Sequence, residues 1–384
     1  MTELAIESVS IAGYRSLRRI RFPVERLTVF VGANGVGKTN LYRALQLLQA
    51  AAAGTFAHEL AAEGGMESAV WAGQRRAKEP VRIELGVRIA DPDGASVQGY
   101  DIAAGLVPQP SRVPAGAAFL QEPQVKSETL ALVAGARRVV MLDRHGPSGF
   151  VRDEDGRRQD LGAGLLASET ALASLQDAAR YPDLHAIRQT MLGWRFYHEV
   201  RTDRDAPLRR PALAVTTPTL SSDGADLAAV FATLAHIRQD TVDLDRAVDD
   251  AFPGARLHIP MPGRTAQFGM IFPDYPKRVF EAAELSDGTL RYLALAGALL
   301  AYRLPPFVAL NEPETSLHPD LLDPLARLLV RAAERTQVWL VTHSERLAAA
   351  VAEHGAVLPR SVVKRAGQTW IDGLRLAGDF ADEE

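Results

Sequence analysis

The chain has 384 residues, of which 47% are hydrophobic and 23% charged, so it can bury a large core as a soluble globular protein. Its formal net charge of -4 gives no overall basic signal, and its lack of cysteine excludes disulfides and thiolate metal sites. The nine histidines show no zinc-ligand spacing, so a structural zinc site is not expected.

The first third of the chain reads as strands followed by a glycine loop. Val9 and Ile11, then Ile20 and Phe22, alternate with polar neighbours and predict two short strands. Leu27 to Val31 predicts a buried strand. It runs directly into GANGVGKT and then into an apolar pattern at helical spacing.

The middle of the chain predicts an antiparallel β subdomain followed by a helical subdomain. Alternating apolar residues from Val81 to Ile89, a further strand around Tyr100 and a hairpin over 138–152 predict an antiparallel β subdomain over 80–160. Residues 165–192, interrupted at Pro182, and 226–249 carry helical periodicity. They predict a helical subdomain over 165–250.

The last third returns to α/β alternation. We expect a helix from about Asp287, a strand Phe307 to Leu310, a helix from about Asp320 and a strand Val338 to Val341. The nucleotide core would then come from 1–60 plus 280–384, within one composite domain over 1–384.

No segment predicts export or membrane insertion. The N-terminus carries acidic residues and lacks the apolar core of a signal peptide, so we expect a cytoplasmic protein. The longest apolar run, Tyr292 to Tyr302, is too short to span a bilayer and predicts a buried helix.

The glycine loop fits the G-x-x-x-x-G-K-[ST] pattern of phosphate-binding loops. Glycines let backbone N–H groups converge on phosphates, Lys38 neutralises their charge, and the Thr39 hydroxyl is a ligand for Mg²⁺. We therefore expect ATP and Mg²⁺ as cofactors. The residues expected to bind nucleotide here are Gly32, Asn34, Gly35, Gly37, Lys38, Thr39 and Asn40.

Two strand ends supply candidate catalytic groups. The strand Phe307 to Leu310 leads into Asn311 and Glu312, and Glu312 is the candidate general base for the attacking water. The strand Val338 to Val341 leads into His343, a candidate donor to the γ-phosphate.

The segment ELSDGTLR, residues 284–291, opens the long apolar helix. Ser286 is either a plain N-cap or, with the Gly288 backbone and the helix dipole, part of an anion site for a γ-phosphate. The spacing alone leaves both interpretations open.

Taken together, GANGVGKT, ELSDGTLRYLALAGALL, LNEPETSLHP and LVTHS resemble the ATPase heads of RecF, the SMC proteins and the OLD-family ATPases. The resemblance implies an α/β P-loop NTPase of ABC type with a mixed central sheet, an antiparallel β subdomain and an inserted helical subdomain. It implies a Walker A motif at Gly32 to Thr39, a signature motif at Leu285 to Gly288 and a Walker B motif at Phe307 to Glu312. It further implies a D-loop near Thr315 to His318 and a switch histidine at His343. It also implies a head-to-tail homodimer that closes on ATP and opens on hydrolysis.

The chain departs from that pattern in several places. Asn311 stands where an acid normally helps to hold Mg²⁺, so weaker metal binding and slow ATP hydrolysis are among the expectations. Gln121 is the candidate for the Q-loop glutamine. Because only 41 residues follow His343 and no sustained heptad pattern occurs, we expect neither the nuclease domain of OLD proteins nor a coiled coil of SMC type.

The sequence leaves the partner open between DNA, in genome maintenance or phage defence, and an effector protein that a nucleotide-gated dimer would regulate. A membrane transporter subunit and a ring-forming AAA+ machine are disfavoured. Direct support for DNA consists of three basic clusters. They are Arg15, Arg18, Arg19 and Arg21; Arg75, Arg76 and Lys78; and Arg201, Arg204, Arg209 and Arg210.

Overall fold

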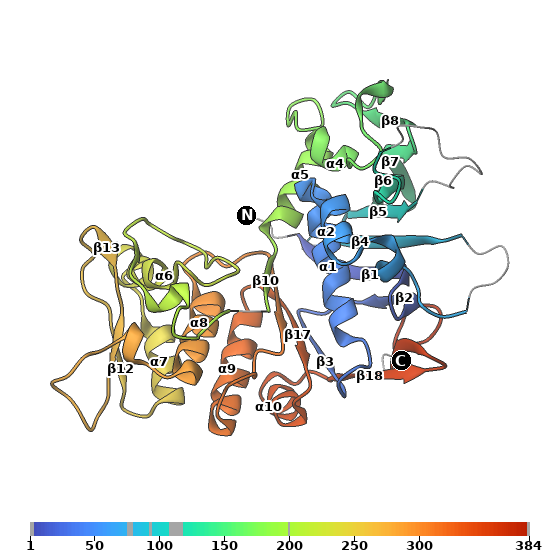
Figure 1. Ribbon diagram of the computed structural model, residues 1–384. Coiled ribbons are helices and arrows are strands. Elements are labelled where there is room, and N and C mark those ends of the chain that lie inside the picture. The colour runs from blue at the N-terminus through green and yellow to red at the C-terminus, as the bar shows by residue number, and fades with distance from the viewer. Residues whose placement is uncertain (1–3, 75–79, 92–93, 107–117, 199, 382–384) are drawn as a thin grey trace. The chain divides into compact units, whose positions relative to one another are not determined.

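The computed structural model describes residues 4–74, 80–91, 94–106, 118–198 and 200–381. The chain divides into two compact units (Figure 1). Unit 1 takes its described residues from Met1–Glu25, Ala33–Trp194 and Arg360–Glu384, and unit 2 consists of Arg26–Gly32 and the described part of Arg195–Pro359. Each unit therefore contains segments that are distant in sequence, and the boundary crosses the range 165–250 at residue 195.

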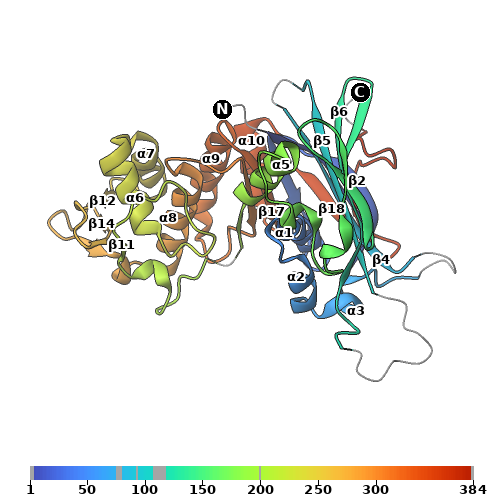
Figure 2. The ribbon, with the colours of Figure 1, turned by 90° about the horizontal axis from the view of Figure 1, so that it is seen from above.

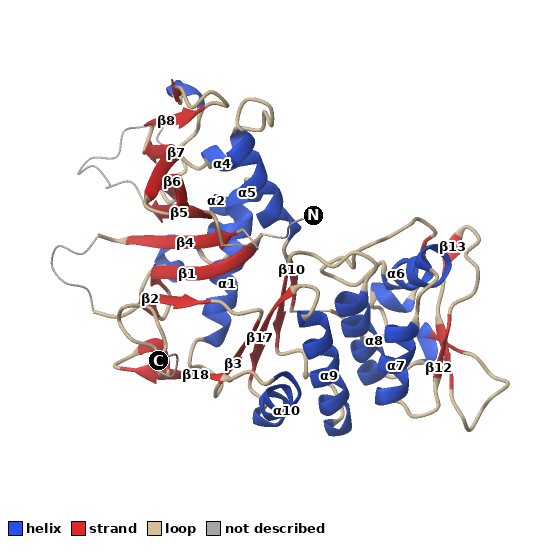
Figure 3. Ribbon diagram, turned by 180° about the vertical axis from the view of Figure 1, so that it is seen from behind, coloured by secondary structure: helices blue, strands red, loops and turns tan. Residues whose placement is uncertain are grey.

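An antiparallel sheet is the main feature of unit 1 (Figure 3). Its order is β2-β1-β4-β5-β6-β7-β8-β9, so the first hairpin joins the predicted antiparallel subdomain. The strands are β1 (Ala5–Tyr14), β2 (Leu17–Pro23), β4 (Arg82–Ala90), β5 (Val97–Gly105), β6 (Gln124–Ala134), β7 (Arg137–His145), β8 (Ser148–Arg152) and β9 (Arg158–Asp160).

Helix α1 (Lys38–Ala53) covers one face of this sheet, against β1 and β4 (Figure 2). Its apolar positions, including Leu41, Leu45 and Leu48, are fully buried, as the helical spacing predicts. Against α1 lie α2 (Phe56–Ala62), α4 (Ala171–Ser174) and α5 (Pro182–Gly193), and α3 (Gly65–Ala69) lies against α2. A short turn η1 (Gly162–Gly164) contacts β8, and a hairpin of β18 (Arg360–Arg365) and β19 (Gln368–Ile371) contacts β2 through β19.

Unit 2 contains four parallel strands in the order β10-β16-β17-β3. They are β3 (Leu27–Val31), β10 (Arg195–Tyr197), β16 (Phe307–Asn311) and β17 (Gln337–Thr342). Every residue of β16 and β17 is buried, which is typical of parallel strands and explains their continuous apolar runs.

Helices and two small sheets complete unit 2. The helices are α6 (Leu227–Thr233), η3 (Leu234–Arg238), α7 (Val242–Ala251), α8 (Asp287–Leu300), α9 (Leu322–Ala333) and α10 (Glu345–Gly355), with 3-10 turns η2 (Pro207–Arg209), η4 (Ala282–Glu284) and η5 (Pro319–Leu321). The small sheets are β11 (Ala212–Leu213) with β13 (Thr265–Ala266), and β12 (Arg256–His258) with β14 (Gly269–Ile271) and β15 (Phe280–Glu281). Helix α8 is apolar almost all round and buried within this unit, as predicted.

Two helical predictions need correction. The segment 226–249 is not one helix, because α6 passes into the π-helical η3 and the chain breaks at Gln239, whose φ is +56°. The segment 165–192 contains only α4 and α5, with Pro182 at the start of α5, where proline fits a helix best. In the described residues no helix is both long and apolar enough to cross a membrane.

Candidate nucleotide site

The phosphate loop, which belongs to unit 1 from Ala33 on, has the backbone that its glycines predict. Gly35 and Gly37 have φ values of +80° and +100°, and Gly37 directly precedes α1. Lys38 is 4% exposed, and its Nζ donates to the Ala33 carbonyl at 2.9 Å, so the loop curls around its own lysine. Backbone N–H groups at the start of a 16-residue helix provide a ready anion site.

A hydroxyl network that the sequence did not reveal supports this loop from within unit 1. Thr369 Oγ1 donates to the Val36 carbonyl at 2.6 Å and lies 2.6 Å from Ser16 Oγ. Asn40 Nδ2 donates to Ser16 Oγ at 2.7 Å, so this amide helps to hold the loop. A Cβ on Gly37 would lie 2.0 Å from Thr369 Oγ1, so only glycine fits there.

The candidate catalytic residues of unit 2 meet at one edge of the parallel strands. Asn311 pairs with Val341, and Thr342 pairs with Val31, the last residue of β3. The carboxyl ends of β16, β17 and β3 are therefore level, which is where ligands bind in open α/β sheets. The strand that leads into the phosphate loop thus ends beside the strand that leads into His343.

Glu312 has an unusual backbone for a side chain of its size. Its φ is +50°, and its N–H donates to the Val341 carbonyl at 2.7 Å, so the ladder fixes this conformation. A left-handed residue other than glycine costs about 1 to 2 kcal/mol, and such strain often marks functional positions. The Glu312 side chain is 29% exposed, and its Oε1 lies 3.6 Å from His343 Nδ1.

Glu314 is a buried carboxylate that the sequence interpretation left without a role. Its side chain is 5% exposed, and its Oε1 accepts from Thr342 Oγ1 at 2.5 Å and from the His343 N–H at 3.1 Å. The same oxygen lies 3.2 Å from His343 Nδ1. Glu314 therefore fixes both the backbone and the imidazole of the candidate switch residue.

His198 is a second residue that sequence reasoning missed. It follows β10 as His343 follows β17, and a histidine directly after the buried aromatic pair Phe196-Tyr197 is the signal that would have found it. Its Nδ1 lies 2.7 Å from Asn311 Nδ2. Asn311 is 2% exposed, and its Oδ1 has no hydrogen-bond partner within the described part of the chain.

That unpaired oxygen bears on the expected Mg²⁺. In the described residues, no group of three or more His, Cys, Asp and Glu side chains is arranged to hold a metal ion. Mg²⁺ in nucleotide sites, however, takes most of its ligands from water and phosphate and needs only one or two protein oxygens. A buried unpaired acceptor costs about 1 to 3 kcal/mol, so Asn311 Oδ1 suits a cation ligand, as does the Thr39 hydroxyl.

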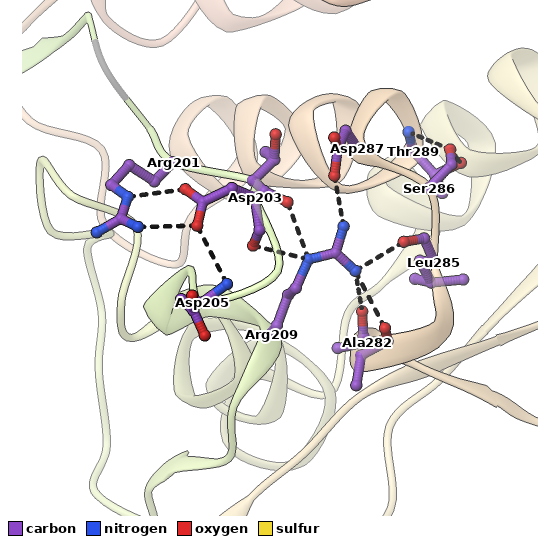
Figure 4. A network of polar contacts seen from close by, with 11 residues as sticks. Arg201, Asp203, Asp205, Arg209, Ala282, Leu285, Ser286, Asp287 and Thr289 are labelled. Carbon is purple, nitrogen blue, oxygen red and sulfur yellow. Dashed lines mark hydrogen bonds and ion pairs between the residues drawn. The ribbon is translucent and has the colours of Figure 1, made fainter.

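The signature segment of unit 2 is held by Arg209 (Figure 4). Its guanidinium donates to the Leu285 carbonyl at 2.8 Å and to the Ala283 carbonyl at 3.1 Å, and forms an ion pair with Asp287 Oδ1 at 2.5 Å. The Arg209 side chain is 10% exposed. Arg209 therefore anchors the signature segment, which corrects its assignment to a basic cluster that supports DNA binding.

Ser286 itself is exposed and caps α8, because its Oγ accepts from the Thr289 N–H at 3.2 Å. A Cβ on Gly288 would lie 3.1 Å from the Ser316 carbonyl, so the signature segment lies against the predicted D-loop. The capping interpretation of Ser286 is thus confirmed in geometry, and an N-cap serine at a 14-residue helix is also suitably placed for an anion.

The remaining sequence candidates fall in different places. Gln121 lines a hollow together with Gly54, the residue that ends α1, whereas the phosphate loop precedes the first residue of that helix. About 24 Å of helix separates these ends, so the expectation of Gln121 as the Q-loop glutamine is wrong. Arg15 pairs with Glu63 at 2.8 Å. Arg75, Arg76 and Lys78 lie outside the described residues.

One family model and several solved structures match this chain. A family model described as "AAA domain, putative AbiEii toxin, Type IV TA system" matches residues 27–93 and 142–349. A Pyrococcus furiosus Smc head domain with an extended coiled coil, bound to the C-terminal domain of ScpA, is 14% identical with a TM-score of 0.53, covering 97% of each chain. The SMC head domain from Thermotoga maritima is 14% identical with a TM-score of 0.47, covering 97% of this chain and 100% of that one. The comparison with curated proteins found no match.

Proposed function

Because the chain belongs to the AAA domain family whose model it matches, and has the P-loop ATPase-head fold, we propose that it binds ATP with Mg²⁺ and hydrolyses it. One observation carries this proposal. Glu312 and His343 lie within 3.6 Å of each other at the strand edge where β3 leads into the phosphate loop. An acid and a histidine at this edge are the groups that water activation and γ-phosphate stabilisation require.

Each residue then has one chemical task. Backbone N–H groups of the loop and Lys38 bind the β- and γ-phosphates, with Gly32, Asn34 and Gly35 shaping the loop. Glu312 orients the attacking water and accepts its proton, and His343 donates to the γ-phosphate oxygens. When bound, Mg²⁺ would neutralise phosphate charge, with Thr39 and Asn311 as its protein ligands.

We propose further that the working form is an ATP-gated head-to-tail homodimer. Support comes from the exposed Ser286 at the N-terminus of α8, held in a fixed segment by Arg209. In this proposal Ser286 and Gly288 of one copy bind the γ-phosphate held by the other. ATP would therefore favour the dimer, and hydrolysis would release it.

The test uses the wild type and Glu312→Gln, with Lys38→Ala and the exposed Glu353→Gln on α10 as controls. We expect Glu312→Gln to retain ATP, to lose turnover by about a hundredfold or more and to stay dimeric in light scattering. Lys38→Ala should lose ATP binding, and Glu353→Gln should behave as wild type. A monomeric Glu312→Gln at saturating MgATP would refute the dimer, and undiminished turnover would refute the role of Glu312.

We propose DNA as the partner, on the basis of a positively charged hollow in unit 1. The hollow has a volume of about 1100 Å³ and is lined by residues of β1, β2, β4, β5, β6 and β19 and by residues 375–377. Five arginines and two acidic residues line it, in a chain whose net charge is -4. The arginines are Arg18, Arg19, Arg21, Arg82 and Arg375.

This partner is tested with the double variant Arg19→Ala/Arg21→Ala, because both residues are exposed on β2. The slope of log affinity for duplex DNA against log salt should fall by about 2, since each phosphate contact contributes about 0.9. The matched control is Arg264→Ala/Arg346→Ala, two exposed arginines of unit 2. Wild-type protein with MgATP that shows no salt-sensitive DNA binding would exclude DNA and favour an effector protein as the partner.

A further inference from the structure

The contact between His198 and Asn311 follows from strand register. Strand β10 pairs in parallel with β16, with Tyr197 opposite Leu310, so the next residues, His198 and Asn311, are also level. Their side chains meet at 2.7 Å between Nδ1 and Nδ2. Because Asn311 is 2% exposed, water has little access to replace this contact.

The Asn311 amide faces His198 with its nitrogen, because Nδ2 lies against Nδ1. An amide nitrogen only donates, so this contact is made by the tautomer of His198 that accepts at Nδ1 and carries its proton on Nε2. The amide oxygen is then turned away from His198, and it is the buried atom without a partner among the described residues. Rotated by half a turn, the amide would present its NH₂ group there, and a donor group cannot ligate a cation.

We propose that His198 is a positioning residue that holds the Asn311 amide with its oxygen toward Mg²⁺. This inference rests on the proposed function, in which Asn311 is a ligand of that metal. A carboxylate at position 311 would offer oxygen on both sides, so an acid needs no such orientation. An asparagine does need it, and the Nε2-protonated tautomer of His198 supplies the acceptor that sets it. Replacing a residue that hydrogen-bonds to a metal ligand commonly lowers metal affinity by about 10- to 100-fold.

The experiment is a double-mutant cycle on the Mg²⁺ dependence of ATP binding, measured by fluorescence with a labelled ATP analogue. His198→Phe keeps a ring of similar size but removes the acceptor. We expect it to raise the Mg²⁺ concentration at half-saturation about tenfold. In the Asn311→Asp background the same change should raise that concentration less than about twofold, because the carboxylate needs no orienting acceptor.

Two controls separate positioning from folding. His198→Gln keeps an acceptor oxygen, so we expect it to restore most of the Mg²⁺ dependence lost in His198→Phe. Binding of the analogue in excess EDTA should be equal in all variants that fold as wild type. An equal loss in the Asn311 and Asn311→Asp backgrounds would overturn the inference, as would unchanged Mg²⁺ dependence in His198→Phe. If ATP binding by the wild type does not depend on Mg²⁺, the metal site of the proposed function is refuted, and this inference with it.

Discussion

Replacing Glu314 tests how the candidate switch histidine is held. Glu314→Ala removes a side chain that is 5% exposed and whose Oε1 accepts from Thr342 Oγ1 at 2.5 Å and from the His343 N–H at 3.1 Å. Thr342 is the last residue of β17, and His343 directly follows it. The change therefore leaves a buried hydroxyl and a backbone N–H without their acceptor.

The size of the effect follows from those two bonds. Hydrogen bonds to a charged group contribute about 1.5 to 3 kcal/mol each. Glu314 Oε2 is buried without a partner in the described residues, which offsets part of that gain. We therefore take the lower values and expect Glu314→Ala to lower the free energy of unfolding by about 3 kcal/mol. For a unit of about 150 to 250 residues this corresponds to a fall in melting temperature of about 6 °C or more.

We expect Glu314→Ala to lower the turnover number for ATP hydrolysis much more than the affinity for ATP. His343 Nδ1 lies 3.2 Å from Glu314 Oε1, so loss of the carboxylate frees the imidazole. We expect the turnover number to fall about tenfold or more, because misplaced catalytic groups cost that much. ATP affinity, which depends on the phosphate loop, should stay within about twofold of wild type.

The assays are thermal unfolding, steady-state ATP hydrolysis and ATP titration of the same samples. Glu314→Gln keeps an acceptor oxygen and should lose about 1 kcal/mol, a third as much, since neutral hydrogen bonds contribute about 1 kcal/mol each instead of about 1.5. Glu353→Ala, on the exposed face of α10, should change neither the melting temperature nor the turnover number. Wild-type melting temperature and turnover in Glu314→Ala would refute this reasoning.

Three further changes test the loop and the signature segment. Gly37→Ala should lower ATP affinity, measured by titration, about tenfold or more, because its Cβ would lie 2.0 Å from Thr369 Oγ1 and its φ is +100°. Gly373→Ala is the control for backbone strain alone, since its φ is +77° and no atom lies near its Cβ, and it should bind ATP as the wild type does. Thr369→Val removes the bond to the Val36 carbonyl and should cost about 1 kcal/mol in denaturant unfolding, with weaker ATP binding; unchanged stability would contradict it. Arg209→Ala should abolish ATP-dependent dimers in light scattering while each monomer still binds ATP, whereas Arg201→Ala, which breaks an exposed pair, should leave the dimer intact.

Local pattern was enough to find the phosphate loop and its flanking elements. Strand β3 has the predicted bounds, and α1 begins at Lys38, because glycine spacing and apolar periodicity are properties of neighbouring residues. The same reasoning placed Glu312 and His343 directly after buried strands. Short-range sequence thus determined the family, the P-loop ATPase fold and the candidate chemical groups.

The supports of those groups depend on contacts between distant residues. His198 meets Asn311 across 113 positions, and Ser16 meets Thr369 across 353. No periodicity links such pairs, because strand register and chain crossing bring them together only after the sheet has formed. The break at Gln239 likewise depends on a left-handed backbone residue that helical periodicity over 226–249 does not reveal. Tertiary structure therefore decided how each candidate group is oriented, because orientation depends on hydrogen-bond partners that the fold supplies.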